Sequence, residues 1–286
     1  MRWRANIDTV PEPATLRELD EEPHVGEPPR PQIPLPLQWL TYLLLMPLVG
    51  LATAIFGTFS LVAGLWDSTG RQQHWIARQW ARALLRIAMS PIQVEGLEHL
   101  QPLRQNNSHR PVAVYASNHL SYYDTPALFA KLPFQFRILA KASLWKVPFI
   151  GWYLQRSGQV PIDTGSGRSL IASLGRGVKT LENGLPLVLF PEGGRTPDGE
   201  VKTMVAGAAW MAIKAQVPLV PVTLVGTYEL LPMHTYVLRP RPLKLIVGKP
   251  IDTTGLTTRD ADALTKQLRQ VIHETYIAET SKTEAQ

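Results

Sequence analysis

A histidine and an aspartate stand five residues apart in the segment Asn118–Asp124, a pattern suited to proton transfer. Imidazole titrates near neutral pH, so His119 can take the proton of an alcohol as the alcohol oxygen attacks. A carboxylate bonded to the other ring nitrogen fixes the tautomer and stabilises the imidazolium, and Asp124 can supply it. The substrate's own hydroxyl would be the nucleophile. The spacing predicts His119 as the base and Asp124 as the residue that orients it.

A pair at this spacing also fits two other interpretations. Asp124 precedes Thr125-Pro126, which is typical of a helix start, so the segment could be a polar loop with a capping aspartate. A metal site would need a further ligand, and no other histidine or carboxylate is close in sequence. The chain has no cysteine, which excludes disulfides, thiolate metal sites and a cysteine nucleophile. A metal site therefore stays a further option for the residues alone.

Two further segments carry side chains suited to an anionic substrate. Phe190–Thr196 follows an apolar run and places Glu192 and Arg195 on either side of two glycines. The backbone near Gly193 can approach a ligand closely, and Arg195 can hold a phosphate through paired hydrogen bonds. Lys141 follows another apolar run and can meet an anion at the start of the next helix. A glycine turn with a surface Glu–Arg pair, and a solvated lysine, are the interpretations without function.

Alternating strands and helices after Pro91 must position these segments. Apolar runs predict the strands, and apolar residues at helical spacing predict the helices between them. The expected strands are 92–95, 111–116, 136–140, 159–162, 185–190, 217–225 and 243–247; the expected helices start at 124 and cover 169–181, 205–215 and 258–278. This alternation predicts a layered α/β domain with a mixed, mostly parallel sheet. The loops at His119 and Glu192 follow strands, where ligands bind in such sheets.

The run from Leu35 to Trp66 contains no charged side chain. One membrane span needs about 20 apolar residues and two need about 40, so the run lies between the two cases. Pro47 and Gly50 fall near its middle, where a helix would kink or turn. The run is therefore either a single long, tilted helix or a re-entrant hairpin of half-helices at 37–49 and 51–66. A buried core hairpin is less expected, because soluble domains rarely contain so long an uncharged run.

A basic amphipathic stretch follows the apolar run. Its arginines lie on one side of a helix with tryptophans among them: Arg71, Arg78, Arg82 and Arg86 with Trp75 and Trp80. Arginine and tryptophan suit the interface of an anionic membrane. The positive-inside bias then predicts a membrane protein with its catalytic domain on the cytoplasmic face. A solvated helix packed on the domain is the alternative.

The chain is basic overall, with a net charge of +6 over 286 residues, which suits an anionic partner. A nucleic-acid binder would interleave a basic patch with aromatics and lack a lipid-sized apolar run, so we predict no nucleic acid. Residues 1–34 are rich in proline and charge and are expected to be disordered. A membrane-associated helical region at 35–90 and a catalytic domain at 91–286 would follow.

Together these segments resemble the glycerophospholipid acyltransferase family, especially its 1-acyl-sn-glycerol-3-phosphate acyltransferases. Counterparts of its four motifs lie in order along the chain: Asn118, His119, Ser121 and Asp124; Lys141, Pro148, Gly151 and Gly158 with Ile162-Asp163; Phe190 to Gly193 with Arg195; and Val217 to Val222. The resemblance implies a layered αβα acyltransferase domain behind an apolar membrane-docking segment. It implies acyl-CoA or acyl carrier protein as the acyl donor and a membrane lipid as the acceptor, and it implies that no metal and no organic cofactor is required.

The resemblance also implies roles for individual residues. His119 would be the base and Asp124 would orient it, while Lys141 and Arg195 would hold the acceptor's phosphate. Glu192 and the backbone near Gly193 would position the acceptor. The implied reaction moves a fatty acyl group to the free hydroxyl of a lysophospholipid, first of all 1-acyl-glycerol-3-phosphate, giving phosphatidic acid.

Four positions depart from the family's motifs. Thr164 stands where the second motif ends in Arg, and Arg168, four residues on, is the candidate replacement. Gly194 and Thr196 replace Thr and Ser, and Val205 stands where Lys is frequent. Fewer cations leave other acceptors open: glycerol 3-phosphate, another lysolipid or an acylated amino-acid lipid. A membrane scaffold without activity is the remaining alternative, which the intact His–Asp pair disfavours.

Overall fold

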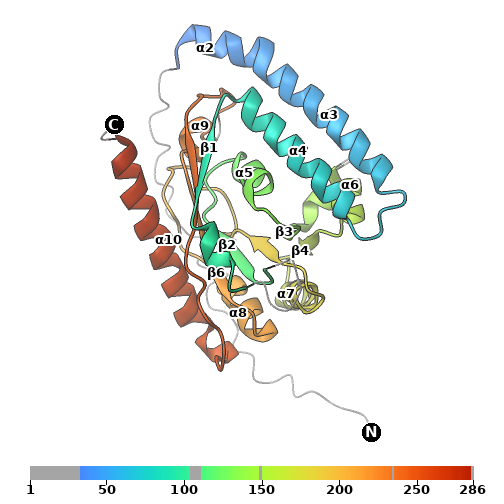
Figure 1. Cartoon of the computed structure of the whole chain (residues 1–286), viewed down its shortest axis with the longest axis vertical. Coiled ribbons are helices and arrows are strands. Elements are labelled where there is room, and N and C mark those ends of the chain that lie inside the picture. The colour runs from blue at the N-terminus through green and yellow to red at the C-terminus, as the bar shows by residue number, and fades with distance from the viewer. Residues whose placement is uncertain (1–32, 104–110, 148–149, 234, 285–286) are drawn as a thin grey trace.

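The computed structural model describes residues 33–103, 111–147, 150–233 and 235–284, which form a layered α/β fold (Figure 1). The segment expected to be disordered, residues 1–34, lies almost entirely outside the described residues. Within them is a seven-stranded sheet in the order β1-β7-β6-β2-β5-β3-β4. The strands are β1 (Ile92–Glu95), β2 (Val114–Ser117), β3 (Arg137–Lys141), β4 (Val160–Ile162), β5 (Leu187–Leu189), β6 (Leu219–Val225) and β7 (Leu243–Val247). Neighbouring strands are parallel except β6 and β7, so the mixed, mostly parallel sheet is confirmed.

Helices cover both faces of the sheet (Figure 1). The helices are α2 (Leu35–Leu40), α3 (Met46–Ala63), α4 (Arg71–Ile87), α5 (Asp124–Lys131), α6 (Ile150–Arg156), α7 (Gly167–Glu182), α8 (Gly207–Ala215), α9 (Thr227–Leu230) and α10 (Ala261–Glu284), with short 3-10 helices at Leu97–Leu100, Ala142–Lys146 and Thr258–Asp260. Helices α4 and α5 pack on one face, and α7, α8 and α10 pack on the other. The predicted αβα layering is therefore present.

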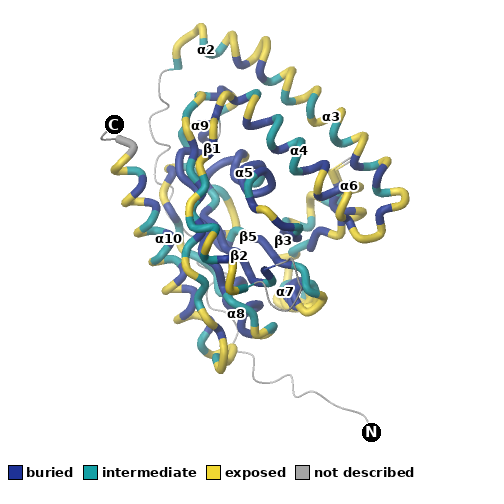
Figure 2. The backbone as a smooth tube through the Cα atoms, viewed as in Figure 1, coloured by how far each residue is buried: buried dark blue, intermediate teal, exposed yellow. Residues whose placement is uncertain are grey.

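Residues of the central strands alternate between two hydrophobic cores, as the two-residue period of a strand requires. Tyr115 and Val188 pack in the core beneath α4 and α5, whereas Val114 and Leu187 pack in the core beneath α7 and α8. Figure 2 shows the buried residues gathered in the strands and on the inward sides of the helices. Because β2 and β5 are buried on both faces, their sequences are apolar except for Ser117 at the end of β2.

The uncharged run forms one continuous helix rather than a re-entrant hairpin. A π-helical turn at Thr41–Leu45 joins α2 to α3, and the backbone N–H of Met46 donates to the Thr41 carbonyl. Pro47 lacks a backbone donor, and the wider turn directly before it accommodates this loss without reversing the chain. By length and composition this helix, Leu35–Ala63, is able to cross a membrane. Of its apolar stretch of 18 residues, only 11% is buried inside the protein. That exposure argues against a buried core hairpin.

Helix α3 lies along α4, the expected basic amphipathic helix (Figure 1). The Trp80 indole N–H donates to the Thr53 hydroxyl at 3.1 Å, and the Gln73 side chain donates to the Ser60 carbonyl at 3.3 Å. Apolar residues of α4, including Ala81 and Leu84, pack in the core of the α/β domain. Helix α4 therefore joins the apolar helix to that domain.

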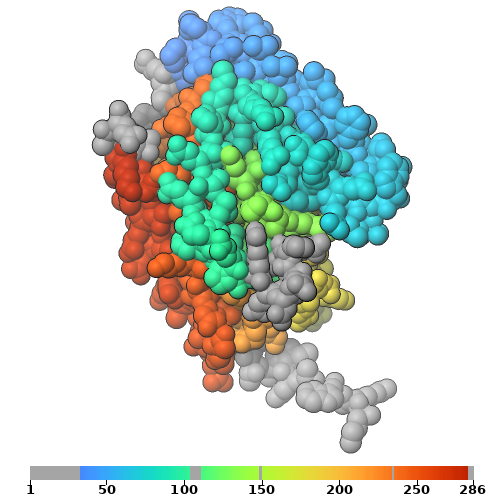
Figure 3. All heavy atoms as spheres, in the orientation of Figure 1, coloured from blue at the N-terminus to red at the C-terminus, as the bar shows by residue number. Residues whose placement is uncertain are grey.

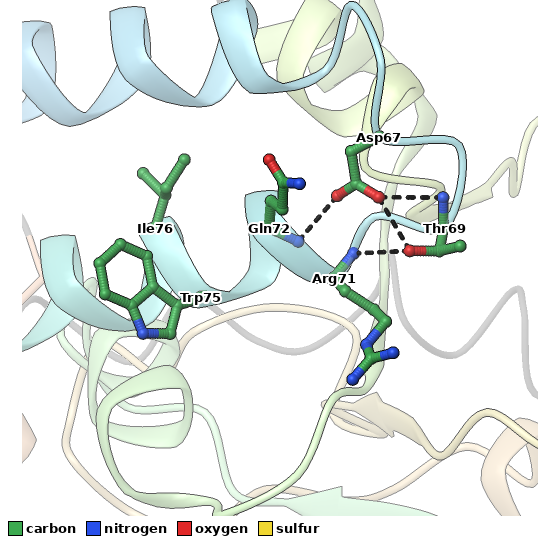
Figure 4. Close-up of a pocket in the computed structure, with 6 residues that line it drawn as sticks. All are labelled: Asp67, Thr69, Arg71, Gln72, Trp75 and Ile76. Atoms are coloured by element: carbon green, nitrogen blue, oxygen red, sulfur yellow. Dashed lines mark hydrogen bonds between the residues drawn. The ribbon is translucent and has the colours of Figure 1, made fainter.

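Asp67 holds the turn between α3 and α4 (Figure 4). One carboxylate oxygen accepts the backbone N–H groups of Gln72 at 2.7 Å and Gln73 at 3.3 Å, and the other accepts the N–H and hydroxyl of Thr69. Burial raises the pKa of Asp67, but these hydrogen bonds outweigh it and hold the pKa below its usual value. The pocket drawn in Figure 4 adjoins the amino end of β3, since Arg137 donates to the Thr69 carbonyl at 2.7 Å.

Candidate active site

The predicted site residues lie along one edge of the sheet. Strands β2, β5, β3 and β4 are adjacent and parallel, so their carboxyl ends share that edge. His119 follows β2, Glu192 and Arg195 follow β5, Lys141 ends β3, and Arg168 lies in the first turn of α7 after β4. Because neighbouring strands are about 4.8 Å apart, β3 lies roughly 10 Å from β2. The sheet order therefore brings four segments that are distant in sequence into one row of loops.

His119 and Asp124 form a hydrogen-bonded pair. The imidazole Nδ1 is 2.8 Å from Asp124 Oδ2, and the same oxygen accepts the backbone N–H groups of Leu120 at 2.6 Å and Ser121 at 2.7 Å. Asp124 is fully buried and makes no capping bond at the start of α5, so its carboxylate faces the histidine segment rather than the helix. With Nδ1 directed at a carboxylate, Nε2 is the ring nitrogen left to accept a proton.

The loop after β5 holds His119 at three points. The ring of Phe190 stacks on the imidazole, with centroids 3.9 Å apart and planes inclined by 14°. Glu192 Oε1 accepts the backbone N–H of His119 at 3.1 Å, and the backbone N–H of Thr196 donates to the His119 carbonyl at 3.2 Å. Both the plane of the base and its backbone are therefore set by the neighbouring strand's loop, before any substrate arrives.

The side chain of Glu192 is buried beside the backbone of His119. Burial raises its pKa to about 8, and the charge of Asp124 adds to the rise. Hydrogen bonds from the backbone N–H groups of His119 and Lys202, and the charge of Lys202, oppose it. The carboxyl is therefore mostly protonated at neutral pH. The resemblance implies that Glu192 positions the acceptor, and this stays a prediction; in the structure the carboxyl accepts backbone N–H groups of His119 and Lys202, and Lys202 was not predicted.

Gly193 and Arg195 complete the same loop. Gly193 has a φ of 75°, a conformation that favours glycine, and its N–H donates to the Phe190 carbonyl at 3.2 Å. That amide closes the turn, so it is already engaged. The guanidinium of Arg195 stacks on the ring of Tyr122, with Cζ 3.4 Å from the ring centroid. This contact is a further link between the two central loops.

Lys141 and Arg168 reach the same edge but remain exposed. Among the described residues, no hydrogen bond or ion pair joins either of them to the His–Asp pair or to Arg195. Thr164, at the position where the family's arginine is expected, is exposed as well. The structure thus brings the base, its partner and the β5 loop into contact, and places Lys141 and Arg168 beside them in solvent.

Two polar residues of the histidine segment anchor it to the rest of the fold. The Asn118 side chain donates to the Leu224 carbonyl at 2.9 Å and accepts the Leu224 N–H at 2.8 Å. The Ser121 hydroxyl donates to the Leu231 carbonyl at 2.9 Å. Sequence reasoning placed both residues in a motif without giving them a role. The anchoring role of Asn118 could have been anticipated, because a buried side-chain amide must satisfy both its donor and its acceptor.

The described residues include no group of three or more histidine, aspartate or glutamate side chains placed to hold a metal ion. The absence of a cofactor stays a prediction. The groups that are present can remove a proton from a substrate hydroxyl and stabilise the resulting imidazolium. A His–Asp pair at the carboxyl edge of an αβα sheet is suited to an enzyme that activates a hydroxyl carried by its substrate.

Comparison with known proteins agrees with this class. Residues 91–225 match the family model described as Acyltransferase. It is 34% identical to the chloroplastic 1-acyl-sn-glycerol-3-phosphate acyltransferase of Arabidopsis thaliana over 205 residues, which are 70% of this chain and 53% of that protein. It is 28% identical to the 1-acyl-sn-glycerol-3-phosphate acyltransferase of Saccharomyces cerevisiae over 242 residues, 82% of this chain and 77% of that one.

The chain spans about half the length of several curated relatives that it matches. Its fold is similar to the crystal structure of the 1-acyl-sn-glycerophosphate acyltransferase of Thermotoga maritima, with a TM-score of 0.70 and 23% sequence identity. That similarity covers 87% of this chain and 98% of the other. It extends beyond residues 91–225, so it includes part of the helical region that precedes the sheet.

Proposed function

We propose that this protein transfers a fatty acyl group from an acyl thioester to the free hydroxyl of 1-acyl-glycerol-3-phosphate, giving phosphatidic acid. The observation that carries the proposal is the His119–Asp124 pair at the carboxyl edge of the sheet, in a chain whose residues 91–225 match the Acyltransferase family model. The names of the relatives support this acceptor. The donor would be acyl-CoA or acyl carrier protein.

The proposed reaction uses the substrate hydroxyl as nucleophile. His119 Nε2 takes the hydroxyl proton as the oxygen attacks the thioester carbonyl, and Asp124 stabilises the imidazolium. The tetrahedral intermediate then collapses and the carbon–sulfur bond breaks. The imidazolium returns its proton to the leaving thiolate, so the products are an ester and a free thiol and the base is restored.

The proposed phosphate site lies on the same edge. Arg195 lies in the loop that holds His119, so it is the cation best placed to bind the acceptor's phosphate. Lys141 lies one strand further along, and a lysine side chain can close part of that distance as a mobile point charge. Arg168 would complete the row on the side where Thr164 replaces the expected arginine.

We also propose that the helix of α2 and α3 lies in one membrane leaflet and does not cross the bilayer. Its outward side chains include Leu35, Trp39, Leu43 and Phe59, which are 62–69% exposed, and Figure 3 shows this helix forming an outer edge of the molecule. Its other side is bonded to α4, whose inner face is in the core. A crossing helix would pull α4 and its arginines into hydrocarbon, which is costly. The catalytic domain would face the cytoplasm.

The test is an assay of the purified full chain with a panel of lysolipids in vesicles and with acyl-CoA or acyl carrier protein, products being identified by mass. We expect phosphatidic acid from 1-acyl-glycerol-3-phosphate. His119→Ala should reduce turnover at least ~10³-fold with an unchanged unfolding midpoint. If the protein acylates only a different lysolipid, that lysolipid takes the place of 1-acyl-glycerol-3-phosphate as the proposed acceptor. Full activity of His119→Ala, or no transfer to any acceptor, would refute the proposal.

A further inference from the structure

Tyr122 and Arg195 form a stacked pair beside the base. The guanidinium carbon lies 3.4 Å from the centroid of the tyrosine ring, which is direct contact with the ring face. Tyr122 belongs to the histidine segment and Arg195 to the loop after β5, so the pair connects two parts of the site. Tyr122 is 57% exposed, so its ring is not needed to fill the core. The contact therefore serves Arg195 rather than the packing of the domain.

A ring on the guanidinium face leaves the N–H groups at the guanidinium edge free. Those edge groups make the paired hydrogen bonds by which arginine recognises phosphate. One of them, on Nη1, is buried and has no hydrogen-bond partner among the described residues. A buried donor without a partner is unfavourable, and a substrate oxygen can supply what is missing. The face of the guanidinium thus contacts the protein, and its edge is left for the ligand.

We propose that Tyr122 is a positioning residue for the acceptor: its ring holds Arg195 with the guanidinium edge presented to the phosphate. The inference rests on the proposed function, in which Arg195 binds that phosphate. Without the ring, arginine would have to be ordered when the acceptor binds, and affinity would fall. The family's motif, Asn-His-x-Ser-x-x-Asp, leaves the position of Tyr122 unspecified.

The first test compares Tyr122→Leu with Tyr122→Phe in steady-state assays of the full chain, with 1-acyl-glycerol-3-phosphate and acyl-CoA varied separately. Leucine removes the aromatic face, and we expect the acceptor KM to rise roughly 3- to 30-fold. The acyl-CoA KM should stay within about twofold. Phenylalanine keeps the ring and should restore the acceptor KM. An unchanged acceptor KM for Tyr122→Leu, or an equal rise for Tyr122→Phe, would overturn the inference.

The second test is a double-mutant cycle with Arg195→Gln. If Tyr122 acts through Arg195, Tyr122→Leu should have no further effect on the acceptor KM once the guanidinium is gone. Additive effects would overturn the role of Tyr122 and leave the phosphate role of Arg195 intact. If Arg195→Gln alone leaves the acceptor KM unchanged, the phosphate role itself fails. Unfolding midpoints of all four proteins separate these outcomes from a loss of folded enzyme.

Discussion

The imidazole of His119 lies face to face with the ring of Phe190, with 3.9 Å between the ring centroids. Phe190 directly follows β5 and packs partly against the core beneath α4 and α5, so the strand fixes the orientation of its ring. The plane of the catalytic base is thereby determined by a neighbouring strand. An aromatic face also attracts the positive charge that the imidazole acquires when it takes a proton.

Replacing Phe190 by leucine should therefore lower kcat by about tenfold, because both the stacking surface and the ring's attraction for the imidazolium are lost. Tyrosine at this position keeps a ring and should retain most of the activity. Turnover at saturating acceptor and thioester measures the effect. A kcat for Phe190→Leu within twofold of the parent enzyme would show that the stack does not support the base.

Asp124→Asn should separate catalysis from folding. The amide oxygen can still accept the N–H groups of Leu120 and Ser121, so the loop keeps its shape. The negative charge that stabilises the imidazolium is removed, and kcat should fall by about 10³- to 10⁴-fold. The unfolding midpoint should change little, whereas Asp124→Ala should lower it as well. Activity of Asp124→Asn near the parent level would exclude the proposed pair.

Glu192 should make stability depend on pH. Its pKa is about 8 in the folded protein against an ordinary value of 4.5, so between these limits the folded state holds a proton that the unfolded state releases. The associated stabilisation is complete below the unfolded value and is lost as the pH rises through 8, a change on the order of 5 kcal/mol in full and of about 3 kcal/mol between pH 6 and pH 9. Glu192→Gln should flatten this dependence. Urea unfolding at pH 6 and pH 9 measures it, and parallel losses in both proteins would contradict the assignment.

Asp67→Ala should destabilise the turn into α4 by about 1 to 2 kcal/mol, because backbone donors at the helix start lose their acceptor. The carboxylate has a lowered pKa, so its contribution is present at neutral pH and is lost as the pH falls through the folded pKa. The parent and Asp67→Ala proteins should therefore converge in strong acid. Denaturant unfolding at neutral and acidic pH tests this; a difference that persists in acid would point to lost packing instead.

The lipid-facing role of the apolar helix can be tested with charges on its outward side. Leu43 and Phe59 are 69% and 62% exposed, and the double replacement by glutamate should weaken binding to anionic vesicles by tenfold or more. Ile171→Glu is the matched control, since Ile171 is an exposed apolar residue on α7, on the other face of the sheet. Co-sedimentation with vesicles is the measurement. Equal losses of vesicle binding for both variants would show that the added negative charge weakens binding wherever it is placed, and would contradict the lipid-facing role of the helix.

Sequence patterns predicted the strands because most are buried, so their apolar runs are long and bounded by turns. Boundaries were less accurate where tertiary contacts decide them. The helix expected to begin at Val205 begins at Gly207, and the Val205 N–H donates to the Pro191 carbonyl at 2.9 Å. The hairpin alternative for the apolar run failed for a similar reason: residue patterns do not show that a π-helical turn can absorb Pro47.

The same difference between local and tertiary contacts determines which site residues could be predicted. His119 and Asp124 were predictable because they are five residues apart and a short loop suffices to join them. The contacts of Phe190, Thr196 and Tyr122 depend on β5 lying beside β2, and no local pattern encodes that pairing. The hydrogen bond from the His119 N–H to Glu192 also depends on this pairing of strands.

One short stretch after α9 touches both the apolar helix and the histidine segment. The Leu231 carbonyl accepts the Ser121 hydroxyl, and the Leu238 carbonyl accepts the Thr41 hydroxyl at 3.5 Å. If α2 and α3 rest in a leaflet, these bonds fix the height of His119 above the hydrocarbon. The enzyme would then select its acceptor by position in the membrane. It would acylate hydroxyls at the level of the glycerol backbone and not those that lie further out in water.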